Sequence, residues 1–358
     1  MERVQMMIIS ILYVISAIFV FITFFLKKKK DEKISFIKFS IISIISFMSY
    51  NTLICFLFRL INIPITLQIL MIFNFVFGII FLVLIIKDKG IQKYSINKKD
   101  VIAICVILLI ATIMSIMNFG TELHIKYIMT DSALHFSAAR EFYETGTLVD
   151  NIKNDMVTGS FMAGAYTNTG ICFKVFAPFI GEINLYKLFI LFDIFIFLFV
   201  GLAIYSAVEK IIDSKSKYIL SLFMIVFFML GYPLNSMIYG FVYLQLGILI
   251  IITIVNVLQC FNENINKKYL YGILFLLNFG LFFTYCIFTP IVYIVEFIYI
   301  IKKEYSENKK IITIKNFMIC AVIFVIPIVF GVYYFVLPHL QATRRWGRNI
   351  YKFGRIHI

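Results

Sequence analysis

Asp131 and His135 are the two residues of this sequence whose types and spacing could do chemistry together. They stand four positions apart in the stretch TDSALHFSAAREFYETGTL, which begins with a Thr-Asp-Ser run suited to a helix start and in which Gly146 can stop the helix. We expect a helix over residues 132–145, with both side chains on one face at its start. A carboxylate beside an imidazole can act as a general base with an orienting partner, or supply two ligands to a divalent cation such as Mg²⁺ or Mn²⁺. The alternative is an ordinary helix cap followed by an interfacial histidine.

The composition of the chain indicates that Asp131 and His135 belong to a membrane protein. Hydrophobic residues make up 62% of the 358 residues and charged residues 15%, whereas water-soluble domains carry about 25% charged residues. Apolar runs long enough to cross about 30 Å of hydrocarbon as helices recur along the chain. We therefore predict an all-α, polytopic transmembrane bundle of about ten helices. The expected helices cover residues 6–26, 35–58, 67–86, 101–118, 186–207, 218–232, 237–259, 269–285, 288–301 and 316–337.

The basic residues set the expected orientation. They give a formal net charge of +14, but they lie in short clusters between apolar runs and form no single basic face, so no nucleic-acid partner is indicated. By the positive-inside rule the clusters are cytoplasmic, which predicts a plasma-membrane protein with its N-terminus outside; the Ile-, Lys- and Asn-rich usage favours a bacterium. The expected regions are four N-terminal membrane helices in residues 1–118, a large extracytoplasmic loop in 119–184, six C-terminal membrane helices in 185–337 and a basic tail in 338–358.

The stretch around Asp131 also resembles a known family. Following a membrane helix, it looks like the first outer loop of GT-C type glycosyltransferases, which include oligosaccharyltransferases and protein mannosyltransferases; the resemblance covers roughly residues 101–210. It implies transfer of a sugar from a polyprenyl-phosphate carrier, with an acidic loop residue that is catalytic. The matching position is Asp131, followed by His135. Three expected helices precede the one that would be first in that family, and the paired acids common there are reduced to Asp131 followed by Ser132.

Further polar residues expected on the same side suit a sugar or a phosphate. Aromatic, amide and guanidinium side chains stack on sugar rings and hydrogen-bond to hydroxyls; the candidates are Arg140, Tyr166, Asn168, Tyr232, Asn235 and Tyr239. Arginines after the last helix suit the phosphate of a lipid carrier, the candidates being Arg344, Arg345 and Arg348. The alternatives are interfacial tyrosines, ordinary turn residues, and a tail bound to anionic lipid or lying in the cytoplasm.

A few polar residues fall inside the expected helices. A charge there costs at least about 2.5 kcal/mol, so such residues need partners or a function. They could line the path of a transporter, stand in the open cavity of a transferase, or form interhelical hydrogen bonds. The residues are Asp193, Asn256, Asn278 and Glu296.

Taken together, the sequence predicts a membrane glycosyltransferase. It would take a sugar from a polyprenyl phosphate or pyrophosphate and deliver it to an envelope glycan, lipid or protein at the extracytoplasmic face. Asp131 would deprotonate or orient the acceptor, and His135 would support it or share a cation. The alternatives are a transporter or flippase for a lipid-linked glycan, a polysaccharide polymerase of another membrane fold, and a scaffold.

Overall fold

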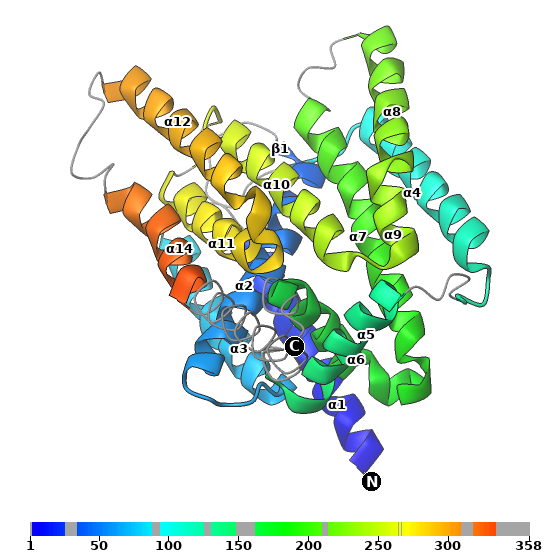
Figure 1. Ribbon diagram of the computed structural model, residues 1–358. Helices are drawn as coiled ribbons and strands as arrows, with labels where there is room; N and C mark the ends of the chain where they lie inside the picture. Colours follow the sequence, from blue (N-terminus) through cyan, green and yellow to red (C-terminus); the bar gives the residue numbers. More distant parts are fainter. Residues whose placement is uncertain are drawn as a thin grey trace, which may run out of the picture.

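The protein is a predominantly helical bundle (Figure 1). The computed structural model describes residues 2–25, 34–87, 94–124, 130–147, 162–209, 214–263, 265, 267–308 and 318–333. Within them, seven segments are long and apolar enough to cross a membrane, and two shorter apolar helices are Leu67–Val83 and Met318–Gly331. The chain thus has the build of a multi-pass membrane protein, while the finer count of about ten crossings stays a prediction.

The elements follow the expected apolar runs closely. The first half of the described chain contains α1 (Glu2–Phe25), β1 (Ile34–Ser35), α2 (Phe36–Leu60), α3 (Leu67–Lys87), β2 (Tyr94–Ser95), α4 (Lys98–Phe119), α5 (Thr130–Thr145) and α6 (Ala163–Ile180). The second half contains η3 (Glu182–Asn184), α7 (Leu185–Val208), α8 (Lys215–Leu230), α9 (Tyr232–Tyr239), α10 (Val242–Cys260), α11 (Lys267–Tyr285), η5 (Cys286–Phe288), α12 (Thr289–Asn308), the π-helical η6 (Ala321–Val325) and α14 (Ile326–Gly331). The strands β1 and β2 have two residues each and pair in parallel.

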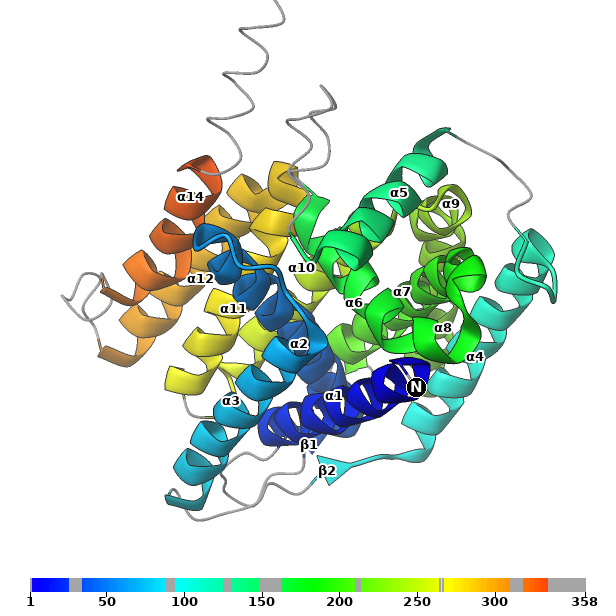
Figure 2. The ribbon, with the colours of Figure 1, turned by 90° about the horizontal axis from the view of Figure 1, so that it is seen from below.

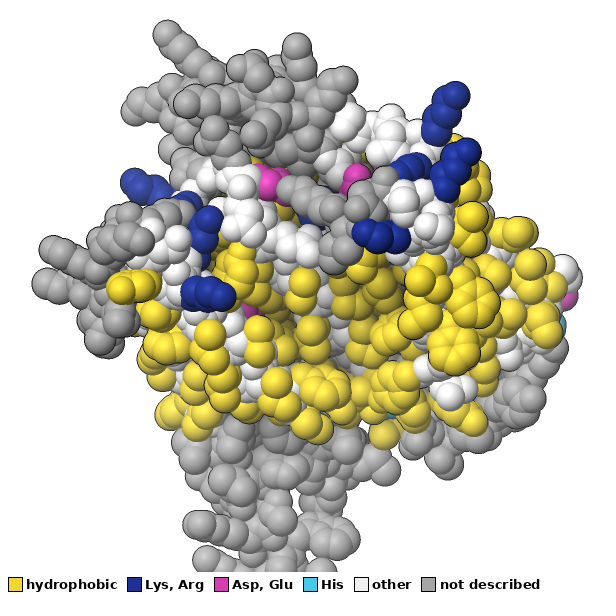
Figure 3. Space-filling view, turned by 90° about the horizontal axis from the view of Figure 1, so that it is seen from above, with side chains coloured by type: hydrophobic (Ala, Val, Ile, Leu, Met, Phe, Trp, Pro, Cys, Tyr) yellow, Lys and Arg dark blue, Asp and Glu magenta, His cyan; other side chains and the backbone are white. Residues whose placement is uncertain are grey.

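Helix ends that adjoin the basic clusters meet at one end of the bundle, which we call the basic end. There the Lys38 ammonium donates to the Gln259 side-chain oxygen at 2.9 Å and joins α2 to α10. The Tyr218 hydroxyl donates to the Lys99 carbonyl at 2.8 Å and joins α8 to α4. Figure 3 shows Lys and Arg side chains along one border of a broad hydrophobic surface. This is the charge distribution that the positive-inside rule describes for one side of a membrane.

The opposite end of the bundle, which we call the α5 end, is built around α5. The Ile65 amide, in the turn between α2 and α3, donates to the Gly146 carbonyl at 2.6 Å. The Tyr143 hydroxyl donates to Glu182, in front of α7, at 2.8 Å. Figure 2 shows α5 far from β1 and β2, which lie at the other end of the bundle. Gly146 has a φ of 66°, the left-handed conformation that ends α5 where the sequence predicts.

The expected helices 269–285 and 288–301 correspond to α11 and α12, which fold back on each other. The helices α11 and α12 run antiparallel around η5, because Lys267 lies 3.3 Å from Glu304 and the Asn278 amide donates to Glu296 at 2.8 Å. Pro290 is the second residue of α12, where a missing backbone N–H leaves no helical hydrogen bond unmade.

The structure differs from the expected long loop at residues 163–180, which form the buried helix α6. The run GAYTNTG, which belongs to the expected loop 119–184, lies in this helix. Its small residues instead allow close helix packing: a Cβ added to Gly170 would lie only 2.9 Å from the Ala139 carbonyl oxygen on α5. Small residues at helix interfaces are common in membrane proteins for this reason. The α6 helix therefore holds α5 in place from within the bundle.

Candidate active site at the start of α5

The first turn of α5 is fixed to the connection between α9 and α10. The Ser132 hydroxyl donates to the Tyr239 carbonyl at 2.6 Å, and Ser132 is almost fully buried. Gly240, next to that carbonyl, has a φ of 69° and ends α9. The described part of α5 begins at Thr130, and Asp131 lies in its first turn. Asp131 is described as a backbone position only, and its side chain lies outside the described residues.

His135 is fixed from the other side by α6. Its Nδ1 atom lies 2.6 Å from the Tyr166 hydroxyl, and both side chains are buried. The Tyr166 hydroxyl also donates to the Met162 sulfur at 3.1 Å. Burial raises the pKa of Tyr166 well above its ordinary value, and the neighbouring Tyr243 adds to the rise. Tyr166 is therefore a neutral partner, and the His135–Tyr166 hydrogen bond positions α5 against α6.

Aromatic rings enclose His135. Its ring centroid lies 4.9 Å from that of Tyr243, 5.6 Å from Phe241 and 5.8 Å from Tyr166. With Nδ1 directed at Tyr166, the imidazole faces aromatic carbon on several sides. Among the described residues no group of three or more His, Cys, Asp or Glu side chains could hold a metal ion. The side chain of Asp131, the other candidate ligand, lies outside the described residues, so a cation shared by Asp131 and His135 stays a prediction.

A carboxyl group lies in a cavity beneath the first turn of α5. Asp193 on α7 is 1% exposed, and neither of its oxygens has a hydrogen-bond partner among the described residues. Asp193, Ser132 and Gly240 line the same cavity, whose volume of about 10 Å³ is close to the space that the centre of one water molecule needs. Burial of a polar group without a partner is costly, so this carboxyl group needs a water molecule or another partner that the described residues do not supply. The sequence singles out Asp193 as a charge within a helix, but only the fold brings it next to α5.

The expected substrate-binding residues are distributed unevenly around this site. Tyr239 is half-buried beside α5, whereas Tyr232 and Asn235 are exposed on α9, which the sequence suggests as a turn. Arg140 is exposed on α5 and forms an ion pair with Glu144 at 2.8 Å. The arginines expected to bind phosphate, Arg344, Arg345 and Arg348, lie outside the described residues.

Tyr166 and Asn168 are buried within the protein and do not present a surface to a sugar. The Asn168 amide donates to the Met48 carbonyl at 3.2 Å, to the Thr52 hydroxyl at 3.1 Å and to the Gly164 carbonyl at 2.8 Å. These bonds join α6 to α2. The role that the structure supports for both side chains is therefore to position α6 beneath α5.

The other polar residues within the apolar helices form interhelical hydrogen bonds. Asn278 binds Glu296 between α11 and α12. Asn256 on α10 accepts from the Ser206 hydroxyl at 3.0 Å and donates to the Ala203 carbonyl at 3.0 Å, both on α7. These contacts match the structural alternative for such residues. Asp193 differs from them because it has no such partner among the described residues.

Sequence reasoning missed Lys174 on α6. Its signal is a single lysine within the apolar run ICFKVFAPFI, and the structure places its ammonium at a pocket on the α5 end. That pocket is separate from the cavity of Asp193 and shares no lining residue with it.

Comparison with known proteins assigns the chain to no family. No protein-family model matches it, and neither a curated protein nor a solved structure matches it significantly.

Proposed function

We propose that this protein is a membrane glycosyltransferase that takes a sugar from a polyprenyl phosphate or pyrophosphate carrier. The acceptor is an envelope glycan, lipid or protein, and the α5 end of the bundle faces the extracytoplasmic side of a bacterial plasma membrane. The observation that carries the proposal is the position of α5. Its first turn, which contains Asp131, lies over the carboxyl group of Asp193, which has no hydrogen-bond partner among the described residues, at the end of the bundle opposite the basic end.

The build of this site supports catalysis better than transport. Catalytic groups must be held on rigid elements, and the start of α5 is held from two directions by Ser132 and His135. A transporter needs a polar path through the bilayer. Asn256, Asn278 and Glu296, which were the other evidence for such a path, are engaged in hydrogen bonds between helices.

In the proposed reaction an acceptor hydroxyl attacks the anomeric carbon of the sugar. The new glycosidic bond forms as the bond between that carbon and the carrier's phosphate oxygen breaks, and the carrier leaves with its phosphate or pyrophosphate. Asp131 accepts the proton of the attacking hydroxyl. His135 holds the first turns of α5 in place, and Asp193 binds a water molecule beneath the first turn of α5. Arg344, Arg345 and Arg348 would bind the departing phosphate oxygens.

A complementation experiment tests this proposal. A deletion strain receives the wild type, Asp131→Asn or Glu141→Gln, each at equal membrane level, and the composition of the envelope glycan is measured. Glu141→Gln is the matched control because it makes the same change from carboxylate to amide on an exposed position of α5. We expect Asp131→Asn to match the empty deletion and Glu141→Gln to match the wild type. Full restoration by Asp131→Asn would leave Asp131 as a structural residue and favour the transporter or polymerase alternatives.

A further inference from the structure

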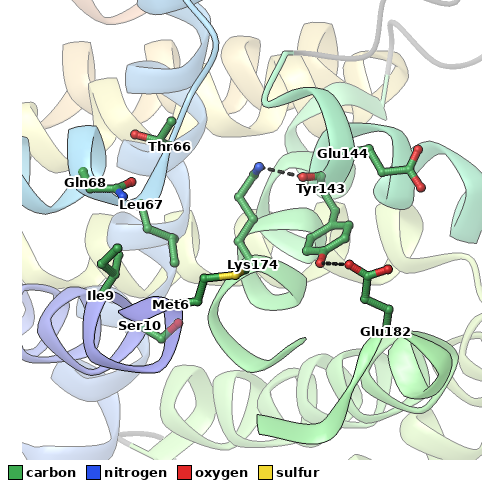
Figure 4. Close-up of a pocket in the computed structure, with 10 residues that line it drawn as sticks. All are labelled: Met6, Ile9, Ser10, Thr66, Leu67, Gln68, Tyr143, Glu144, Lys174 and Glu182. Atoms are coloured by element: carbon green, nitrogen blue, oxygen red, sulfur yellow. Dashed lines mark hydrogen bonds between the residues drawn. The ribbon is translucent and has the colours of Figure 1, made fainter. Parts of the chain in front are cut away.

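A second pocket opens at the α5 end of the bundle. It lies beside the last turns of the α5 helix, whereas the candidate active site lies at the first turn. It has a volume of about 400 Å³, within the range of about 300–1,000 Å³ that is usual for small-molecule sites. Its walls come from the start of α1, the start of α3, the last turns of α5, and α6 with η3 (Figure 4). Glu144 on this wall lies 13 residues beyond Asp131, which is about 20 Å along the helix axis. The pocket is therefore a separate site and not an extension of the first.

Polar groups with unused hydrogen-bonding capacity line this pocket. Ser10 on α1 is fully buried, and its hydroxyl has no hydrogen-bond partner among the described residues. The Lys174 ammonium donates to the Tyr143 carbonyl at 2.6 Å, which is one bond for a group that can donate three. Figure 4 shows this bond beside the one from the Tyr143 hydroxyl to Glu182. A ligand in this pocket can accept hydrogen bonds from the remaining donors of the Lys174 ammonium.

The charges around the pocket do not favour an ionic ligand. Among the described lining residues, Lys174 is the cationic side chain, and Glu144 and Glu182 are the anionic ones. Glu144 is already paired with Arg140, and Glu182 accepts from Tyr143. An anion would face two carboxylates and a cation would face the ammonium. A neutral ligand that both donates and accepts hydrogen bonds meets neither repulsion.

The pocket also offers apolar contact on one side. Met6 and Ile9 on α1 and Leu67 on α3 face the polar groups of α5, α6 and η3 across the space shown in Figure 4. A pyranose ring has this combination, because it carries hydroxyls around its edge and C–H groups on its faces. We propose that this pocket binds an uncharged sugar unit of a glycan, held by Lys174, Glu144 and Glu182. The proposal concerns binding alone and does not depend on whether the protein transfers sugar.

Protection of Lys174 tests the proposal directly. The purified full chain in lipid nanodiscs is treated with an acetylating reagent, and the rate of Lys174 acetylation is followed by mass spectrometry. One arm adds neutral free sugars, namely methyl glycosides of hexoses and N-acetylhexosamines and the trisaccharide maltotriose. A second arm uses nanodiscs that contain a monoglucosyl diacylglycerol, and a third adds inorganic phosphate. At a ligand concentration ten times the dissociation constant, the rate should fall by about tenfold.

The three arms separate the sources of the ligand. Protection by the free sugars supports a free or protein-linked glycan, and protection by the glycolipid alone supports a lipid headgroup; both agree with a sugar site. Protection by phosphate in place of sugars, or no protection in any arm, would overturn the proposal.

Saturation-transfer NMR of the protecting sugar gives an independent readout. Ser10→Leu fills the pocket and should abolish the signal. Because Ser10 is buried and this change could disturb α1, Glu182→Gln provides a second test: it keeps the size of an exposed side chain and removes the charge of an acceptor. It should weaken binding without changing the thermal unfolding midpoint. Unchanged sugar signals in both variants would contradict the assigned contacts.

Discussion

The Nδ1 atom of His135 lies 2.6 Å from the hydroxyl of Tyr166. This contact joins α5, the helix that carries the catalytic candidate Asp131, to the buried helix α6. The two residues are 31 positions apart and come from a stretch that looks in sequence like one long loop. Their contact makes the start of α5 part of the protein core. Rigid support of this kind is what a catalytic carboxylate at position 131 requires.

Removal of the Tyr166 hydroxyl should loosen this support. Tyr166→Phe keeps the ring but removes the hydrogen bond to the buried His135 Nδ1 atom, and the loss of a buried partner costs about 1–3 kcal/mol. We expect a lower thermal unfolding midpoint in nanodiscs and a partial loss of envelope glycan. Tyr305→Phe is the matched control, because Tyr305 is 46% exposed on α12. Equal midpoints for the two variants would show that the His135–Tyr166 bond does not stabilise the fold.

Ser132→Ala should disturb the position of α5 and change the global stability of the protein only slightly. The hydroxyl bonds the Tyr239 carbonyl, and a single hydrogen bond contributes about 0.5–1.5 kcal/mol net. The variant should fold, yet it should produce less glycan than Ser137→Ala, an exposed change on the same helix. Quantitative glycan analysis at equal membrane level is the measurement. Indistinguishable glycan levels in the two serine variants would argue against a role for this contact in activity.

Asp193 should prove necessary for function and dispensable for folding. Asp193→Asn keeps the shape and removes a buried carboxyl that has no partner among the described residues, so the unfolding midpoint should stay equal or rise. Glycan production should fall by at least about tenfold, or about 1.4 kcal/mol in the barrier. The two measurements together decide the role of Asp193. A variant that is less stable but fully active would make Asp193 a structural residue.

Glu296 should behave in the opposite way. Glu296→Gln can still accept from Asn278 and should support wild-type glycan levels, whereas Glu296→Ala should cost about 0.6–1.7 kcal/mol of stability, the usual range for interhelical hydrogen bonds in membranes. Thermal unfolding and glycan analysis of both variants check this. If Glu296→Gln abolished function in a stable protein, the transporter alternative would gain its strongest support.

Lys174 should react with acylating reagents at a lower pH than an ordinary lysine. Burial lowers its pKa from the ordinary 10.5, with nearby Cys55 acting in the opposite direction. A lower pKa means that more of the amine is neutral, and therefore nucleophilic, at any pH below the ordinary value. The pH profile of Lys174 acetylation, compared with that of a lysine in a short peptide, measures the shift. A profile at or above that of the peptide would contradict the partly buried setting.

Much of the fold can be predicted from the sequence because the thickness of the bilayer sets the length of the apolar runs, and the positive-inside rule sets the position of the basic clusters. The predicted ranges 35–58 and 67–86 lie within two residues of α2 and α3. The turn after Tyr285 falls between the predicted helices 269–285 and 288–301. Gly146 ends α5 as predicted because a left-handed stop depends on local backbone chemistry.

Residues 163–180 could not be predicted in the same way. Gly and Asn are turn residues by local preference, and only the neighbouring helices reveal that small side chains here allow close packing. The same limit applies to Asp193 and Lys174. The sequence marks each as a charge among apolar residues, but the groups around it come from segments far away in the chain.

The most direct test of the proposed transfer is the level of the sugar donor in the membrane. Polyprenyl-linked sugars are extracted from the deletion strain carrying Asp131→Asn, Glu141→Gln or the wild type at equal membrane level, and are quantified by mass spectrometry. A transferase blocked at its catalytic carboxylate predicts that one polyprenyl-linked sugar accumulates with Asp131→Asn as it does in the empty deletion, while Glu141→Gln stays at the wild-type level. Wild-type donor levels with Asp131→Asn would contradict a catalytic role for Asp131.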